Sequence, residues 1–291
     1  MRGRASVQPH PVIIPIITLN ATPMLAKVPA SGMFVSEPPP HLFGNPANEK
    51  AHRAWTNANW LKSRFHFSFA EYRDARNQNF GALRVLNDDL VQPARGFGQH
   101  PHRDMEIATI VLGPGSLTHK DSMGTEETLH RGAVQFMTAG TGVYHEEHNR
   151  DPENPLRFLQ TWIVPRKRGL SPNYGSYTPA SASEYANGWS HLVSDVGGAG
   201  KVNINQDFNI YMAEVDAGVS LPPLALPAGR QAYVVCAEGA AQVSLSSGGP
   251  PVELGAQDAA KCTGGPQQAL HVTSTAPARS LVVAMEMQAA A

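Results

Sequence analysis

The chain has 291 residues, 42% of them hydrophobic, and its 23 lysines and arginines nearly balance 24 aspartates and glutamates. That composition supports a buried core and one or two domains, and it provides no basic field for direct binding to nucleic acid. No apolar run is long enough for a membrane-spanning helix. The two cysteines, Cys236 and Cys262, are not in a CxxC pair, and we expect both to be reduced, buried thiols of an intracellular protein, most simply a cytoplasmic one.

Residues 1–50 are predicted to form an N-terminal extension. The first 36 residues contain no Asp or Glu but include Arg2, Arg4 and Lys27, and prolines are frequent. An acid-poor start of this kind is compatible with an organellar transit peptide, although Arg and Ser are sparse for one. The extension is therefore either a disordered tail or a targeting segment, and organellar targeting is the alternative to a cytoplasmic location.

Short apolar segments bounded by turn residues fill the next part of the chain. They lie at residues 82–86, 107–112, 133–137 and 158–164. Segments of this length, several of them rich in β-branched residues, predict short strands, so the fold class is all-β, a barrel or a sandwich. Within this part, His66 lies between two phenylalanines and is expected to be a hydrogen-bonded core residue.

A Pro-, Gly-, Ser- and Tyr-rich stretch from Pro165 to about Ser183 is predicted to be a linker along the surface. Strand-like segments resume after it, at residues 208–212, 231–236, 241–245 and 280–285. This second block resembles the first, but after His191 its only histidine is His271. We therefore expect a metal-binding domain over residues 51–180, linker included, and a domain without a metal site over residues 181–291.

Two short motifs carry the chemistry of the chain. The first, His-x-His, places His100 and His102 two residues apart, and the second, Gly-x-x-His-x-Glu, places Glu147 two residues after His145. Residues i and i+2 of a strand share one face, so each pair can point into one cavity. Three neutral nitrogens and one carboxylate suit a divalent transition metal, as in non-haem iron oxygenases.

The sequence leaves the carboxylate ligand open. Glu106 has the same strand parity as the first two histidines, and Glu147 has the same parity as the third, whereas Glu146 alternates outward. His119 and Asp121 also share parity. They are expected either to support the metal site or to stabilise a turn as a pair.

The spacing of these motifs resembles the cupin superfamily. The run from His100 through Glu106 to Gly113 reproduces its first signature, and the run from Gly132 to Asn149 resembles its second, with Thr138 where proline is usual. Within the cupins the chain resembles the pirin family over residues 51–291, most strongly to about residue 180. The residues that carry this likeness are His100-Pro-His-Arg-Asp-Met-Glu106, His119-Lys-Asp-Ser-Met-Gly124 and Met137-Thr-Ala-Gly-Thr-Gly142.

The resemblance implies a bicupin, that is, two double-stranded β-helix (jelly-roll) barrels, with one metal in the N-terminal barrel. It implies Fe(II) as the metal, or another divalent transition metal, held by three histidines and the glutamate two residues after the third. Here these ligands are His100, His102, His145 and Glu147. Glu106 would then lie beside the metal, and either glutamate is a candidate catalytic base.

The resemblance also implies an oxidoreductase that resembles quercetin 2,4-dioxygenase. Such a quercetinase would open the ring of a small aromatic, flavonol-like substrate with dioxygen and release carbon monoxide. The alternative is a non-catalytic, iron-binding module that senses redox state and regulates a protein partner, as described for a transcription cofactor of the family. The same four ligands serve both functions, so the motifs do not separate them.

Overall fold

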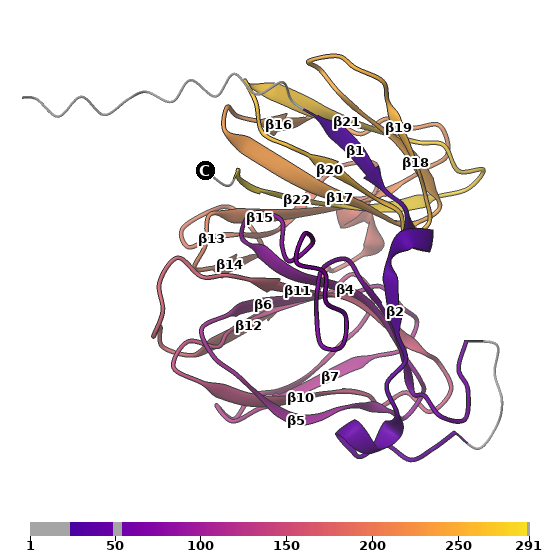
Figure 1. The fold of residues 1–291 in the computed structure, drawn as a ribbon, viewed down its shortest axis with the longest axis vertical. Helices are drawn as coiled ribbons and strands as arrows, with labels where there is room; N and C mark the ends of the chain where they lie inside the picture. The colour runs from indigo at the N-terminus through magenta and orange to yellow at the C-terminus, as the bar shows by residue number, and fades with distance from the viewer. Residues whose placement is uncertain (1–23, 49–53, 290–291) are drawn as a thin grey trace, which may run out of the picture.

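The structure, a computed structural model, describes residues 24–48 and 54–289. They fold into two β-barrels stacked on each other (Figure 1), each made of a seven-stranded and a four-stranded sheet. This confirms the predicted all-β fold of two jelly-roll barrels. Three short 3-10 helices accompany the strands in these ranges: η1 (Ala30–Gly32), η2 (Pro40–Phe43) and η3 (Ala182–Tyr185).

The first barrel consists of β2 (Phe34–Ser36), β3 (Leu61–Phe65), β4 (Leu83–Val91), β5 (Gly96–His102), β6 (Glu106–Val111), β7 (Leu117–Asp121), β8 (Glu126–Leu129), β9 (Val134–Thr138), β10 (Val143–Asn149), β11 (Leu156–Ile163) and β12 (Asn173–Tyr177). Its large sheet has the order β12-β9-β6-β11-β4-β3-β2, and its small sheet has the order β5-β10-β7-β8.

The second barrel consists of β1 (Leu25–Val28), β13 (Ser190–Asp195), β14 (Val202–Ile204), β15 (Phe208–Val215), β16 (Leu224–Leu226), β17 (Arg230–Glu238), β18 (Ala240–Leu245), β19 (Val252–Gly255), β20 (Ala259–Cys262), β21 (Gln268–Ser274) and β22 (Ser280–Gln288). Its large sheet has the order β1-β20-β17-β22-β15-β13-β14, and its small sheet has the order β16-β21-β18-β19.

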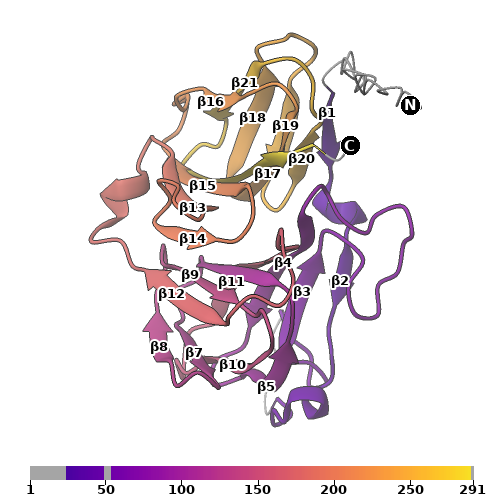
Figure 2. The same ribbon diagram turned by 90° about the vertical axis from the view of Figure 1, so that its left-hand side faces the viewer.

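The two large sheets face each other, so the molecule consists of four layers with the small sheets outermost (Figure 2). An apolar cluster fills the space between them and includes Leu86 and Ile110 of the first barrel and Ile210 and Val283 of the second. Because both faces of each large sheet are buried, many of its strands are buried along most of their length. This explains the short apolar runs in the sequence.

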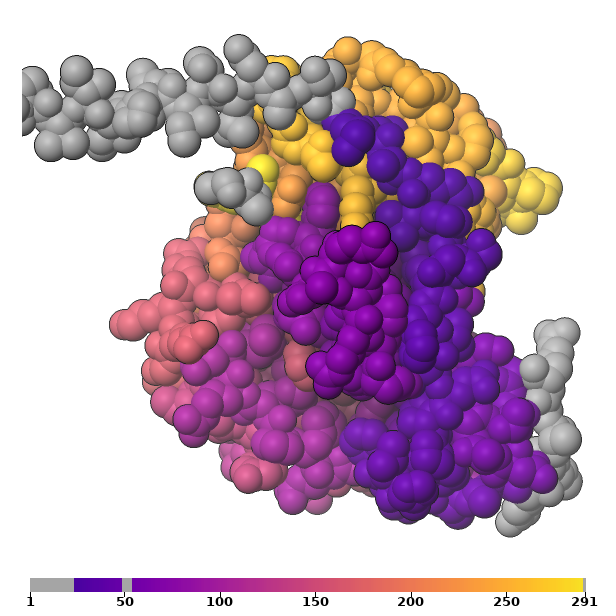
Figure 3. Space-filling view, viewed as in Figure 1, coloured from indigo at the N-terminus to yellow at the C-terminus, as the bar shows by residue number. Residues whose placement is uncertain are grey.

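The predicted N-terminal extension is wrong for the part of it that the structure describes. Within residues 24–48, β1 pairs with β20 of the second barrel and β2 pairs with β3 of the first. Figure 3 shows this segment, in indigo, lying across both barrels. Its partners are distant in sequence, so no local pattern indicates the pairing. The disorder or targeting predicted for residues 1–23 lies outside the described residues.

The predicted linker also contains a strand. Asn173–Tyr177 forms β12, which pairs antiparallel with β9 at the edge of the first large sheet. The chain then enters the second large sheet at β13. Both cysteines are buried free thiols, as expected. In the described ranges, no helix is long and apolar enough to cross a lipid bilayer.

His66 joins the two barrels. Its Nδ1 lies 3.0 Å from the hydroxyl of Tyr233 on β17, and the side chain is 2% exposed, which confirms the expected hydrogen-bonded core histidine. Burial lowers its pKa from 6.5 to about 4, and nearby Arg64 and Lys261 lower it further against the opposing effect of Asp88. The folded protein therefore keeps this imidazole neutral.

This pKa predicts a pH dependence of stability. Between pH 6.5 and pH 4 the unfolded chain binds a proton on His66 that the folded chain does not, so the free energy of unfolding falls as the pH falls. From pH 7 to pH 4.5 we expect a loss of about 2.5 kcal/mol from this group. Urea unfolding at both pH values, for the metal-free wild-type protein and for metal-free His66→Gln, measures this loss. The variant should lack it, because a glutamine side chain does not titrate. Equal losses in the two proteins would contradict this assignment.

Candidate metal centre

Two strands of the small sheet bring the motif histidines together. β5 and β10 pair antiparallel, and His145 lies directly opposite His100. Between His145 and Glu147 the register shifts, so that Glu147 lies opposite Phe97. From His145 to Glu147 the chain advances two residues on β10, whereas the paired segment of β5 advances three. Such an irregularity is a β-bulge, which changes the direction of side chains and is frequent beside active sites. The bulge lets Phe97 and His100 both face the interior.

The turns at the ends of these strands explain other motif residues. Asp104 has a positive φ of 49° and reverses the chain between β5 and β6, and its backbone N–H donates to the Gly140 carbonyl. Gly140 lies before β10 with a φ of 44°, where a Cβ would collide with the carbonyl oxygen of Leu170. These residues hold the two motifs in place without contributing ligands.

Three imidazoles form a compact triangle. The ring centroids of His100, His102 and His145 lie 4.5 to 4.9 Å apart, and one ligand atom from each lies within 4.8 Å of the others. His100 Nδ1 lies 2.8 Å from the Gly98 carbonyl, which leaves its Nε2 for a ligand. Nε2 of His145 is buried and has no hydrogen-bond partner within residues 24–48 and 54–289. An orphaned buried nitrogen in a cluster of nitrogens fits a metal site.

Burial keeps these rings neutral, as metal ligation requires. It lowers the pKa of His102 to about 3, with a smaller contribution from His100. Burial also lowers the pKa of His100, and it lowers that of His145 with help from the neighbouring imidazoles. The donor set is therefore ready to bind a divalent transition metal in neutral solution.

A cradle of polar side chains on the large sheet holds Glu147. Gln135 donates to its Oε1 at 2.8 Å, Gln160 donates to its Oε2 at 2.9 Å, and the Thr109 hydroxyl lies 3.4 Å from Oε1. The carboxylate is 3% exposed, and burial raises its pKa to about 7 against these donors. Oε2 has a single donor and retains a lone pair for a metal ion.

His119 supports His145. The Nδ1 atoms of the two rings are 3.5 Å apart, and His119 Nε2 lies 3.1 Å from Asp121 Oδ2. Tyr174 stacks on His119 with centroids 4.5 Å apart. His119, His145 and Glu147 also form a potential metal group, but both nitrogens of His119 already have partners. Both expected roles have support: His119 orients His145, and Asp121 Oδ1 accepts the backbone N–H groups of Met123 and Thr125 in the turn after β7.

Glu106 does not lie beside the histidines, which corrects the sequence-based expectation. It accepts a hydrogen bond from the Thr138 hydroxyl at 2.8 Å and lies 3.3 Å from Asn205 Nδ2 of the second barrel. The turn after β5 breaks the strand, so parity with His100 and His102 does not continue into β6. Glu106 faces the contact between the barrels and is excluded as a base or a metal neighbour.

An aromatic cavity of about 300 Å³ adjoins the histidines. His100, His102 and Glu147 line it, and its aromatic walls are Phe43, Phe65, Phe69, Phe97 and Trp162. Phe43 comes from η2, in the segment predicted to be an extension. Trp162 packs edge-on against His102, with centroids 4.8 Å apart. The cavity lies at the lower end of the size range of small-molecule sites, about 300–1,000 Å³.

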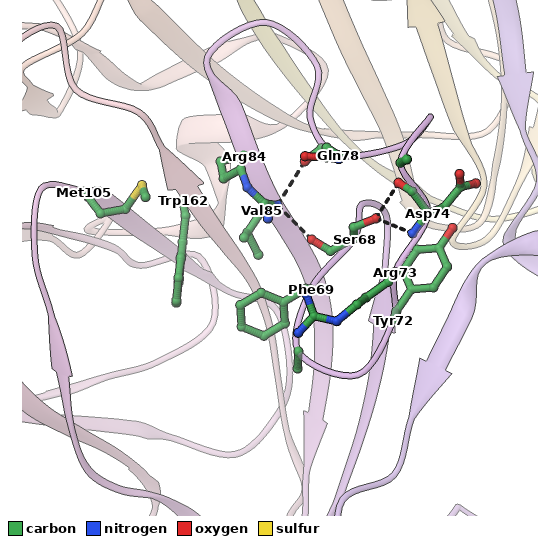
Figure 4. A pocket seen from close by; sticks show the side chains of 12 residues that line it. Ser68, Phe69, Tyr72, Arg73, Asp74, Gln78, Arg84, Val85, Met105 and Trp162 are labelled. Atoms are coloured by element: carbon green, nitrogen blue, oxygen red, sulfur yellow. Dashed lines mark hydrogen bonds between the residues drawn. The ribbon is translucent and has the colours of Figure 1, made fainter.

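A second hollow, of about 630 Å³, shares Phe69 and Trp162 with the aromatic cavity, and Figure 4 shows the side chains that line it. The loop between β3 and β4 forms much of it. The guanidinium of Arg84 donates to the carbonyls of Ser68 and Gln78, and the Ser68 hydroxyl bonds the backbone of Asp74. These bonds fix the loop that supplies Phe69 to the aromatic cavity.

Sequence reasoning did not identify the cradle of Glu147. Gln135 and Gln160 are the single amides of strands β9 and β11, at positions that face the barrel interior. A polar residue at such a position is the signal that indicates a buried partner. Thr109 gave no signal, because threonine is common in strands.

Known proteins match both barrels. The Pirin profile matches residues 48–163, and the profile of the quercetinase C-terminal cupin domain matches residues 191–285. A quercetin 2,3-dioxygenase of Escherichia coli K12 is 40% identical over 170 residues, 58% of this chain and 70% of that protein. A pirin-like protein of Caulobacter vibrioides is 40% identical over 202 residues, 69% of this chain and 83% of that protein.

Among solved structures, the bacterial pirin YhhW of Escherichia coli in complex with nickel(II) has a TM-score of 0.73 and 28% identity, covering 92% of this chain and 100% of that one. The bacterial relatives are thus similar in sequence to more than half of this chain, and the solved structure is similar across both barrels.

The two glutamates give a matched test of the ligand set. We expect Glu147→Gln to lower the affinity for Fe(II) or Ni(II) at least 10-fold, because an amide replaces the anionic ligand, whereas Glu106→Gln should leave it within about 2-fold. Competition with a chromophoric chelator measures both. Comparable losses in both variants, or a loss in Glu106→Gln alone, would contradict the placement of the carboxylates.

The role of His119 has its own test. His119→Phe keeps a ring against Tyr174 but removes the bond to His145, and we expect a 10- to 100-fold loss of metal affinity with one ion still bound. His130→Phe, at an exposed position, is the control. Complete loss of the ion, as expected for His145→Ala, would instead make His119 a ligand.

Proposed function

The chain belongs to the pirin family, and from its histidine triangle, Glu147 and the aromatic cavity we propose that it is a metal-dependent dioxygenase that opens the ring of flavonols such as quercetin. We propose Fe(II) as the metal, bound by His100, His102, His145 and Glu147. The observation that carries the proposal is the position of this donor set at the wall of a cavity lined by aromatic side chains.

The cavity selects a flat aromatic molecule. Phe43, Phe65, Phe97 and Trp162 come from four separate parts of the chain and present rings to one space. Aromatic faces and edges pack well against a planar ring system and exclude water from it. A flavonol bound in this cavity would direct its adjacent 3-hydroxyl and 4-keto oxygens toward the metal ligands.

The metal, when bound, supplies Lewis-acid polarisation and lowers the pKa of the substrate hydroxyl. Glu147 is the carboxylate among the proposed ligands, and its oxygen accepts the proton of that hydroxyl. Gln135 and Gln160 hold the carboxylate in position during this transfer. Trp162 and Phe97 hold the ring, so that the reacting carbons face the metal ligands.

The overall reaction is balanced without a further oxidant. A flavonol and O2 give an aryl ester of a phenolic carboxylic acid together with carbon monoxide. One atom of O2 is added at ring carbon 2 and the other at carbon 4, and carbon 3 leaves with its own oxygen. The relatives are named 2,3-dioxygenases, whereas loss of carbon 3 corresponds to oxygen insertion at carbons 2 and 4, the regiochemistry that we propose.

The test is turnover of quercetin by the protein reconstituted with Fe(II) under anaerobic conditions and then exposed to O2. We expect flavonol absorbance to fall and one carbon monoxide to form per flavonol consumed. His145→Ala should lose metal and turnover together, because it removes a buried ligand. Glu106→Gln is the control and should keep both.

Two other outcomes would contradict the proposal. A metal-free His145→Ala protein that still consumes quercetin would exclude the site as the catalytic centre. Bound iron without turnover of quercetin would favour the non-catalytic module that responds to the oxidation state of iron and regulates a protein partner.

A further inference from the structure

A row of polar side chains crosses the interior face of the first large sheet. Gln135, Thr109, Gln160 and Asn87 lie on the neighbouring strands β9, β6, β11 and β4, each directly paired in register with the next. The first three bond Glu147 and one another. Asn87 is the fourth, one strand beyond Gln160, or about 4.8 Å away. It takes no part in holding Glu147.

The side-chain oxygen of Asn87 has no hydrogen-bond partner in the described part of the chain. The residue lines the aromatic cavity, is 5% exposed, and its Oδ1 is buried and unpaired. A buried, unsatisfied amide destabilises a fold, and such groups are rare in the absence of a role. On the neighbouring strand β3, the residue paired with Asn87 is Phe65, one of the aromatic walls of the cavity.

Asp89 follows Asn87 on the same face of β4 and also lines the cavity. It is 3% exposed, and the only hydrogen-bond partner of its carboxyl group in the described ranges is the hydroxyl of Ser63. Its neighbour Asp88 faces the other way and pairs with Arg157 at 2.6 Å. Burial raises the pKa of Asp89 to about 8 against the opposing effect of the hydrogen bond from Ser63, with smaller contributions from Asp88 and Glu147. At neutral pH it is a carboxylic acid that can donate a hydrogen bond.

We propose that Asn87 and Asp89 form a hydrogen-bonding subsite for oxygen substituents on the rings of the aromatic substrate, separate from the oxygens at the metal. This inference rests on the proposed function and adds the substrate class: polyhydroxylated rather than unsubstituted ring systems. A phenolic hydroxyl that enters can pair with the amide oxygen of Asn87 and with the acid proton of Asp89, whereas a bare ring leaves this oxygen and this proton desolvated and without a partner.

Two ligands and one substitution test the subsite. Quercetin carries several ring hydroxyls, whereas 3-hydroxyflavone keeps the 3-hydroxyl and 4-keto pair and lacks the others. Titration of each into the anaerobic Fe(II)-loaded protein gives the two dissociation constants. We expect the wild-type protein to bind quercetin about 10-fold more tightly, as one or two hydrogen bonds would provide.

Asn87→Leu should reduce that preference to about 2-fold or less by weakening quercetin alone. Metal content and the affinity for 3-hydroxyflavone should stay as in the wild type. Because it removes an unpaired buried amide, this variant should melt at the same temperature or higher, which a purely structural role for Asn87 would not allow. Asp89→Asn, which can still donate a hydrogen bond, should keep most of the preference, whereas Asp89→Leu should lose it.

If Asn87→Leu does not fold, Asn87→Ala serves the same comparison, because it removes the amide without adding volume. Equal affinity of the wild-type protein for both flavonols would overturn the subsite alone. The subsite would also be overturned if Asn87→Leu kept the preference for quercetin, or if it weakened the binding of quercetin and of 3-hydroxyflavone equally. If neither flavonol binds the wild-type protein, the proposed function fails, and the subsite fails with it.

Discussion

The antiparallel pairing of β5 with β10 is the constraint on which the candidate centre depends. It places His145 opposite His100, and the bulge beside this pair lets Phe97 face the same interior as His100 and His102. The turns at Asp104 and Gly140, joined by a hydrogen bond, fix both strand ends. Because strand alternation then dictates where each side chain points, three imidazoles converge without any one of them lying in an unusual backbone conformation.

Placing these groups inside a barrel has an energetic cost, and the large sheet offsets it. A buried carboxylate needs donors, and Gln135, Gln160 and Thr109 provide them to Glu147 from three adjacent strands. The imidazoles remain neutral, and one buried nitrogen of His145 has no partner among the described residues. The second barrel has an apolar interior instead. It covers the outer face of the first large sheet, which gives the row of cradle residues a rigid support.

The sequence predicted the features that follow from local alternation. Residue spacing alone indicated inward positions for His100, His102 and His145 and two blocks of short strands. The resemblance to the cupins and pirins added the two barrels and the choice of Glu147 as the carboxylate. Glu106 was misplaced because parity was extended across the turn at Asp104. The strands at residues 25–28 and 34–36 were missed because their partners are remote: Leu25 pairs with Cys262. The polar row that ends at Asn87 depends on the register of four strands, which no single segment encodes.

The central claim is that one divalent ion is held by His100, His102, His145 and Glu147 at the wall of the aromatic cavity. Crystals of the anaerobic Fe(II)-loaded protein, measured at the iron absorption edge, test it most directly. The account predicts a single anomalous peak in the first barrel, in contact with nitrogens of the three histidines and an oxygen of Glu147. A peak on His119, His145 and Glu147 that leaves His100 and His102 free, or no peak in this barrel, would contradict it.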